Sequence, residues 1–414
     1  MKLDLTDMLY ALSFALDSVE AELLGVDTGH GRRVAYLSLL MGKEAGFRDE
    51  ELRDFIGCCL LHDNALTEYI YEELSKSPMS EDLSVNIADI IKENRLKMNH
   101  DHSVTGEMNI RLLPFRSDVK NIVLCHHENA DGTGALGMTA VEMPLKAQIV
   151  HLVDFADTAG WIKFETMTDT ELEDIRKRVQ SKTGNEFSEE AVELFLKAVT
   201  YDKIAYLRDK GLLHCLREEI SSEISDYSNE EIRNIADLFA KIIDYKSEFT
   251  QSHSKGVADK AAIMAGYYGF DDEKTTRFYF AGAMHDIGKL AISNDILEKP
   301  GKLTTDEFAE MKNHASATYH ILKRIKGIPD IVEWASNHHE KLNGKGYPRG
   351  LTADELSFEE QLMACIDIYQ ALTEKRPYKD GMSHEKTISI MKDMADKGEL
   401  NSDIVYDISV VMAE

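Results

Sequence analysis

The sequence has little positive charge and no long hydrophobic run. Its 47 Lys and Arg stand against 74 Asp and Glu, a formal net charge of −27. Because a polyanion repels a protein of the same sign, this balance argues against DNA or RNA polymers and anionic membranes as partners. No apolar stretch approaches the roughly 20 residues of a membrane-spanning helix. Residues 1–20 carry acids where a signal peptide carries bases, so we expect no targeting segment.

Cysteine, proline and glycine are also sparse. The five cysteines contain no CxxC pair and their number is odd, which suits a reducing compartment and predicts a cytoplasmic protein. Outside a few loops that hold most of the Gly and Pro, apolar residues recur every three to four positions, as in residues 232–245. This periodicity predicts an all-α fold.

A series of histidines and aspartates occurs twice in the same order. His30 and His62 are 32 residues apart, as are His253 and His285, and an aspartate follows each second histidine. Further on, two histidines 24 residues apart recur in both halves, the second opening a His-His-Glu triplet, and an aspartate follows 28 or 29 residues later. The two series are His30, His62, Asp63, His102, His126, His127 and Asp154, and His253, His285, Asp286, His314, His338, His339 and Asp367.

The repeated series predicts a tandem duplication. A chain of 414 residues is long enough for two or three domains. We expect one domain at residues 1–200 and a second at 228–414, joined by a helical connector at 201–227. Small polar residues followed by acids in 224–231 are typical of a helix start, which fits a second domain that begins there.

Five histidines and two aspartates per half could hold two metal ions. Imidazole and carboxylate suit divalent Fe, Mn, Zn and Ni alike. A carboxylate beside a histidine, such as Asp286 beside His285, could bridge two ions. Two ions a few ångströms apart can activate a water and neutralise charge during in-line attack at phosphorus. The residue types therefore indicate hydrolysis of a phosphodiester or a phosphomonoester.

Two local features bear on this chemistry. If the helix persists, Lys289 lies one turn after His285 on the same face and could hold a phosphate oxygen. The glycines after His338 and His339 predict that their helix ends soon after the pair. The simpler alternative is that these glycine-rich segments are only tight turns.

The C-terminal motifs resemble those of the HD-GYP domain, a subgroup of the HD phosphohydrolase superfamily. The resemblance rests on His253, HDIGK at 285–289, His314, HHEKLNGKGYP at 338–348, Asp367 and RPYK at 376–379. A weaker copy covers the N-terminal half. The resemblance implies an all-helical fold and metal-dependent hydrolysis of a cyclic dinucleotide, cyclic di-GMP or cyclic GMP-AMP, to a linear dinucleotide or GMP.

The resemblance also implies roles for individual residues. It makes the seven residues of the C-terminal series metal ligands, for Fe or Mn, with Asp286 as the bridge. Asp286 and Lys289 would be catalytic, with Lys289 on a phosphate. Tyr347 would shape the nucleotide pocket and Arg376 would lie near the substrate. Phe249 stands where three-metal members carry a glutamate, which favours two divalent ions.

Some positions depart from the family pattern. Asn343 and Gln370 replace two usual aspartates, which bears on substrate preference and rate more than on metal binding. The N-terminal copy keeps its whole series but has Leu66 at the lysine position and Gly134-Ala135-Leu136 in place of Gly-Tyr-Pro, and Lys163 begins the segment that replaces RPYK. We expect this copy to hold metal in a regulatory or structural role, the alternative being hydrolysis of a different phosphoester.

Two other functions stay open from the sequence. The same ligand set could serve an HD phosphohydrolase that acts on another nucleotide. Neither half need be a catalyst, in which case the protein would sense a cyclic dinucleotide, oxygen or metal. The sequence leaves the oligomeric state open, a homodimer included.

Overall fold

The computed structural model describes residues 1–24, 29–76, 94–220, 223–246, 252–297, 299, 301–375 and 380–413. Over these ranges the regular structure is helical apart from one two-stranded antiparallel sheet, which confirms the predicted all-α class. Among the residues described, every helix is too short or too polar to cross a bilayer. Contacts group the chain into an N-terminal unit, Leu12–Glu223, and a C-terminal unit, Met1–Ala11 with Ile224–Glu414.

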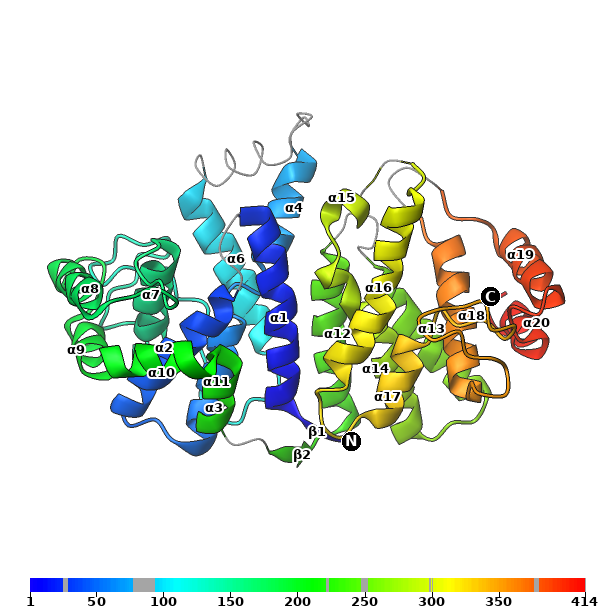
Figure 1. Ribbon diagram of the computed structural model, residues 1–414, viewed down its shortest axis with the longest axis horizontal. Coiled ribbons are helices and arrows are strands. Elements are labelled where there is room, and N and C mark those ends of the chain that lie inside the picture. Colours follow the sequence, from blue (N-terminus) through cyan, green and yellow to red (C-terminus); the bar gives the residue numbers. More distant parts are fainter. Residues whose placement is uncertain are drawn as a thin grey trace. The chain divides into compact units, whose positions relative to one another are not determined.

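Several helices of the N-terminal unit pack on α2. Helix α2 packs against α3, α7, α9 and α11, and α4 packs against α6 (Figure 1). Because α2 has neighbours on several sides, its buried residues run along nearly its whole length. The helices are α1 (Leu5–Leu24, shared with the C-terminal unit), α2 (His30–Glu44), α3 (Asp49–Leu60), α4 (Leu66–Lys76), α6 (Arg95–Ile110), α7 (Leu145–Thr158), α8 (Asp169–Ser181), α9 (Glu189–Ala198), α10 (Tyr201–Lys210) and α11 (Leu212–Glu219).

The C-terminal unit is a helical bundle in which α14 packs against α12, α13 and α17, and α18 packs against α13, α17 and α19 (Figure 1). Its elements are β1 (Lys2–Asp4), β2 (Ile224–Asp226), α12 (Asn229–Asp244), α13 (His253–Tyr267), α14 (Asp272–Met284), the 3-10 helix η1 (Ile287–Ala291), α15 (Asn294–Leu297), α16 (Thr305–Leu322), α17 (Pro329–Ser336), α18 (Phe358–Thr373), α19 (His384–Asp396) and α20 (Ser402–Val411).

The first residues of the chain complete the C-terminal unit. Strand β1 pairs with β2 in antiparallel register, with Lys2 opposite Asp226. The amino group of Met1 donates to the carbonyl of Tyr227 at 2.7 Å. The predicted connector at 201–227 contains α10 and α11, which the contacts place in the N-terminal unit. The domain boundaries at residues 200 and 228 stay predictions about the extent of the repeat.

Capping residues fix where several helices begin. Ser228 accepts from the backbone N–H of Glu231, and the Glu231 side chain accepts in return from Ser228 N–H, a capping box that starts α12. The helix start predicted at 224–231 is therefore confirmed. Ser357 and Glu360 form the same box at the start of α18, the helix that carries Asp367.

Two expectations about helix ends are wrong. Helix α14 ends at Met284, and His285 and Asp286 lead into η1, so Lys289 does not follow His285 on a continuous α-helical face. Helix α17 ends at Ser336, before His338 and His339 and not after them. In both places the cluster histidines lie just beyond a helix end, where the backbone is free of the helical repeat.

Candidate metal centres

The C-terminal series converges from five parts of the bundle. His253 is the first residue of α13, His314 lies on α16 and Asp367 on α18, while the other members follow the ends of α14 and α17. All are buried except His339, whose side chain is 28% exposed. The structure thus brings the seven predicted residues into one cluster, His253, His285, Asp286, His314, His338, His339 and Asp367.

The carboxylate of Asp286 lies between two pairs of histidines. Its Oδ2 is 3.2 Å from Nε2 of His285 and 3.7 Å from Nε2 of His253. Its Oδ1 is 3.5 Å from Nε2 of His314 and 3.8 Å from Nε2 of His338. One oxygen therefore serves each pair, which is the arrangement that a carboxylate bridging two cations requires.

Three histidines are held in one tautomer by the backbone. The Nδ1 atoms of His285, His314 and His338 lie 2.6–2.7 Å from the carbonyl oxygens three residues earlier. Because a carbonyl can only accept, each Nδ1 carries the proton and each Nε2 offers a lone pair to the cluster. Nε2 of His285 and Oδ1 of Asp286 are buried without a hydrogen-bond partner. Buried polar atoms are rarely left so, and neutral imidazole with carboxylate suits a divalent cation.

His253 is oriented by an acid that the sequence reasoning missed. Glu374, the residue after α18, lies with Oε2 3.1 Å from Nδ1 of His253. Burial works to lower the pKa of His253, but Asp367 and Glu374 outweigh it and raise this pKa to about 9. Gln370, at the position where the family has its second aspartate, instead accepts from Nζ of Lys260 at 2.6 Å.

The predicted substrate-facing residues lie at the same cluster. Nζ of Lys289 reaches Oδ2 of Asp286 at 2.5 Å across the 3-10 turn. Burial works to raise the pKa of Asp286, but His285 and Lys289 hold it well below its usual value. The ring of Tyr347 is 4.7 Å from that of His339, and burial raises the pKa of this tyrosine. Arg376 and Phe249 lie outside the described residues.

The glutamate of each His-His-Glu triplet holds the following loop. The carboxylate of Glu340 accepts from the backbone N–H groups of Arg349, Gly350 and Leu351 at 2.7, 3.0 and 2.9 Å. In the N-terminal unit, Glu128 accepts from two backbone N–H groups, at 2.8 and 2.9 Å. This role was not predicted, although the triplet was the signal that could have suggested it. The glutamates order the loop and leave ligation to the histidines.

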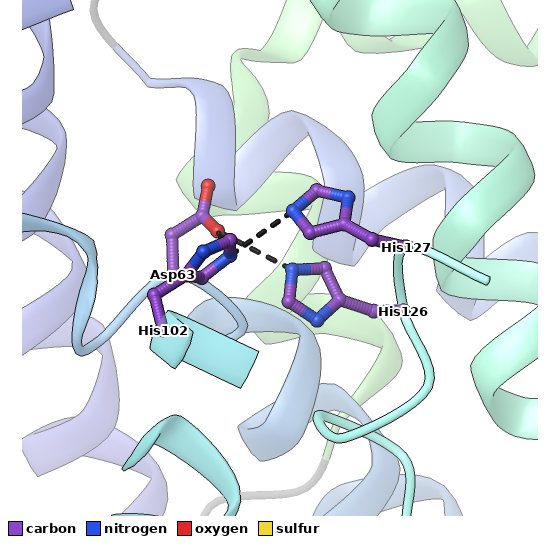
Figure 2. Close-up of side chains that lie close together, drawn as sticks. All are labelled: Asp63, His102, His126 and His127. Atoms are coloured by element: carbon purple, nitrogen blue, oxygen red, sulfur yellow. Dashed lines mark hydrogen bonds and ion pairs between the residues drawn. The ribbon is translucent and has the colours of Figure 1, made fainter. Parts of the chain in front are cut away.

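The N-terminal series forms a second cluster, in which an aspartate again lies between histidines. Oδ2 of Asp63 is 3.3 Å from Nε2 of His62, and its Oδ1 is 3.4 Å from Nε2 of both His102 and His126. Figure 2 shows Asp63, His102, His126 and His127 pointing toward one another. Oδ1 of Asp63 and Nε2 of His126 are buried without a hydrogen-bond partner. His30 and Asp154 complete the set, with Nε2 and Oδ1 3.3 Å apart.

The N-terminal unit has an aspartate at the position that Gln370 occupies in the C-terminal unit. Asp157, three residues after Asp154, lies 2.7 Å from Nδ1 of His30 and accepts two hydrogen bonds from Arg33 at 2.8 Å. What this unit lacks is the phosphate-facing lysine, because Leu66 is buried at the start of α4. Lys163 is exposed, and Ala135 carries no ring to match Tyr347.

Two segments of the chain match family models described as HD domain, residues 28–159 and residues 237–404. The chain is a tandem HD-domain protein. This confirms the predicted resemblance, and each segment includes the whole of one cluster series. HD domains bind divalent metals, and the clusters of this tandem HD-domain protein have the residues to hold them.

Relatives of the tandem HD-domain protein include phosphodiesterases from Vibrio cholerae. It is 26% identical over 417 residues to a 3'3'-cGAMP-specific phosphodiesterase 1, across 98% of this chain and 91% of the relative. It is 39% identical over 159 residues to a 3'3'-cGAMP-specific phosphodiesterase 3, across 38% of this chain and 35% of that one. The crystal structure of a cyclic GMP-AMP specific phosphodiesterase from the same organism matches 100% of this chain with a TM-score of 0.65 at 21% identity, which shows a shared fold.

Proposed function

We propose that the C-terminal unit is a metal-dependent phosphodiesterase that hydrolyses a cyclic dinucleotide. The observation that carries this function is the position of Asp286, with one oxygen toward each histidine pair and Lys289 on Oδ2. In hydrolysis by two metal ions, a carboxylate can bridge the ions. The ammonium group of Lys289 beside it can bind a phosphate oxygen. The names of the relatives support the substrate class, since they include cGAMP and cyclic di-GMP phosphodiesterases.

Two divalent ions, Fe or Mn, are proposed for this cluster, with the seven residues of the C-terminal series as ligands. When bound, such ions supply an acidified water and neutralise charge on the phosphoryl oxygens. The backbone carbonyls that bind Nδ1 of His285, His314 and His338 keep each Nε2 aimed inward, so the ligands are oriented before metal arrives. The choice between cyclic di-GMP and cyclic GMP-AMP, and between a linear dinucleotide and GMP as product, is left to the assay.

The protein side chains bind and orient the substrate. Lys289 is 20% exposed at its side chain and would exchange Asp286 for a non-bridging phosphate oxygen, which it stabilises as a point charge. Tyr347 can stack on a base and donate a hydrogen bond from its hydroxyl, and burial raises its pKa further above neutral pH. Arg376 is proposed as a further contact to the substrate.

The N-terminal cluster is proposed to hold metal without hydrolysing the cyclic dinucleotide. Its ligand geometry parallels that of the C-terminal cluster, but a leucine stands at the lysine position. Loss of a preorganised positive charge weakens the stabilisation of a transition state that gains negative charge.

The test uses the full chain loaded with Mn²⁺ or Fe²⁺ and a panel of cyclic di-GMP, cyclic GMP-AMP and nucleoside monophosphates. Changes to residues that only orient metal ligands cost about 10- to 100-fold, so Asp286→Ala should lower turnover by more than about 100-fold and reduce bound metal. Asp354→Ala, a change of an exposed aspartate in the same unit, is the matched control. Turnover of monophosphates alone would favour another phosphohydrolase, and tight binding of cyclic dinucleotides without cleavage would favour a sensor.

A further inference from the structure

A histidine outside both series lies beside the N-terminal cluster. His151 is on α7, one turn before Asp154, and is 6% exposed. Its Nδ1 is 3.0 Å from the carbonyl oxygen of His126, so Nδ1 donates and carries the ring proton. Its Nε2 is buried without a hydrogen-bond partner. The matching position in the C-terminal unit is Ala364, so this histidine belongs to the N-terminal unit alone.

His151 lines a pocket that opens on the cluster. The pocket has a volume of about 520 Å³, and its walls include Asp63, His102 and Asp154 of the cluster. This volume lies within the range of about 300–1,000 Å³ that is usual for small-molecule sites. The pocket therefore has room for a ligand the size of a nucleotide next to the proposed metal position.

The chemistry of the other walls indicates the kind of ligand. Arg95 is exposed at the pocket and supplies a guanidinium, which suits a phosphate. Leu66 and Phe155 supply apolar and aromatic surface, which suits a flat base. Nε2 of His151 offers a lone pair, and a fully ionised phosphate has no proton to donate to it. His151 must therefore meet a different part of the ligand, a hydroxyl or an amino group.

We propose that this pocket binds a nucleotide-sized phosphoester, with its phosphate toward the N-terminal cluster and a sugar hydroxyl or base amino group donating to Nε2 of His151. Because Asp63 and Asp154 would repel a phosphate, the site requires cations on the cluster. This site goes beyond the proposed hydrolysis, since it lies in the other unit and needs no cleavage. Its occupant is a mononucleotide, for which GMP is the probe.

Calorimetric titration of the full chain tests the site. The Asp286→Ala variant, loaded with Mn²⁺, disables the C-terminal cluster, so the signal comes from the N-terminal unit. GMP should bind, and addition of His151→Ala should weaken GMP about tenfold, as loss of one hydrogen bond predicts. The same change should leave the affinity for inorganic phosphate unaltered. His151→Gln, which keeps an acceptor oxygen, should recover part of the affinity, and His214→Ala, at an exposed histidine, is the control.

A second variant blocks the pocket without touching the cluster. Thr158 is an exposed residue of the pocket wall, so Thr158→Trp should exclude GMP while Mn²⁺ binding stays unchanged. Failure of GMP to bind the Mn²⁺-loaded protein overturns the proposal. Equal weakening of GMP and inorganic phosphate by His151→Ala also overturns it, because His151 would then act only through the cluster. Neither outcome depends on hydrolysis of cyclic dinucleotides by the unmutated protein, so the two proposals fail separately.

Discussion

In each cluster a carboxylate orients the first histidine. This carboxylate follows the last aspartate of the series, but at a different distance along the chain in each unit. In the N-terminal unit Asp157 does this from three residues after Asp154. In the C-terminal unit Glu374 does it from seven residues after Asp367, and a longer side chain covers the extra turn. A partner of this kind fixes the ring and raises the basicity of the ligand, so its position along the helix can change while its role is kept.

Loss of Glu374 should weaken metal binding in the C-terminal unit. We expect Glu374→Gln to lower metal affinity about 10- to 100-fold, because His253 would lose the carboxylate on Nδ1. A chelator competition measures this, with Glu310→Gln at an exposed position as the control. Gln370→Asp in the same chain should restore much of the affinity, since it recreates the position of Asp157. An unchanged affinity in the single variant would show that Glu374 has no such role.

Metal binding should depend on pH through His253 and His62. Neighbouring carboxylates overcome burial and raise both pKa values to about 9, above the ordinary 6.5. Without metal, the stability from these protonated rings is complete below pH 6.5 and is lost as the pH rises through about 9. A metal ion must displace the protons, so its apparent affinity should increase between pH 7 and 9.

Two measurements check this dependence. Thermal unfolding of chelator-treated protein should shift to lower temperature from pH 7 to 9, and Mn²⁺ competition over the same range should show tighter binding. Glu374→Gln should flatten the part of the slope that comes from His253. A metal affinity that does not change with pH would contradict the raised pKa values.

The cluster residues that could be predicted from the sequence are those that occur in both halves at nearly the same spacing. Spacing alone named both series, and the structure brings each together. Glu374 escaped because its partner lies 121 residues away and its counterpart in the other half is not at the same place. His151 escaped because a single histidine on an apolar helix has no signal of its own. A sequence repeat identifies the residues that both halves share. A contact found in only one half can be identified only from the structure.

At the scale of elements, η1 and α16 approach closely at a glycine. A Cβ on Gly288 would lie 2.0 Å from the carbonyl oxygen of His314 and 2.6 Å from the backbone nitrogen of Thr318. The backbone N–H of Gly288 donates to Oγ1 of Thr318 at 3.0 Å. The condition that α14 continues through HDIGK is not met, and the contact with α16 at Gly288 is a long-range feature that no local signal in HDIGK reveals.

Gly288→Ala should therefore displace α16 and with it His314. We expect a loss of stability of about 1–3 kcal/mol from overpacking, together with weaker metal binding in the C-terminal unit. Chemical unfolding and metal titration measure the two effects. Gly266→Ala, on α13 with open space where the Cβ would go, is the matched control and should be neutral or slightly stabilising. Equal behaviour of the two variants would contradict the close approach.

At the scale of the whole molecule, two clusters with no residue in common should lose their metals independently. Asp63→Ala should remove the metal of the N-terminal unit and change the kcat/KM for cyclic dinucleotides by less than about tenfold. Metal analysis with kinetics measures this, and Asp174→Ala at an exposed site is the control. A collapse of hydrolysis in Asp63→Ala would assign the N-terminal cluster a part in catalysis.

The all-α class was predictable from the sequence. The pairing of residues 2–4 with the C-terminal unit was not. Helical periodicity and the repeat gave an all-α fold with two similar parts, because both signals are local or internal to the sequence. Pairing of β1 with β2 joins residues 2–4 to residues 224–226, and three-residue strands leave no pattern to detect. Cytoplasmic location, a homodimer and the lack of DNA or RNA partners stay predictions.

The pairing of β1 with β2 also affects the order in which the chain can fold during synthesis. Met1 binds Tyr227, a residue 226 positions later in the chain. At about 5–20 residues per second, a ribosome adds the partner strand roughly 10–45 s after the first one has been made. The opening residues must therefore wait while the intervening unit is synthesised, and they take their place only when the second copy begins to emerge. Assembly of the proposed phosphodiesterase unit thus joins segments that are synthesised far apart in time.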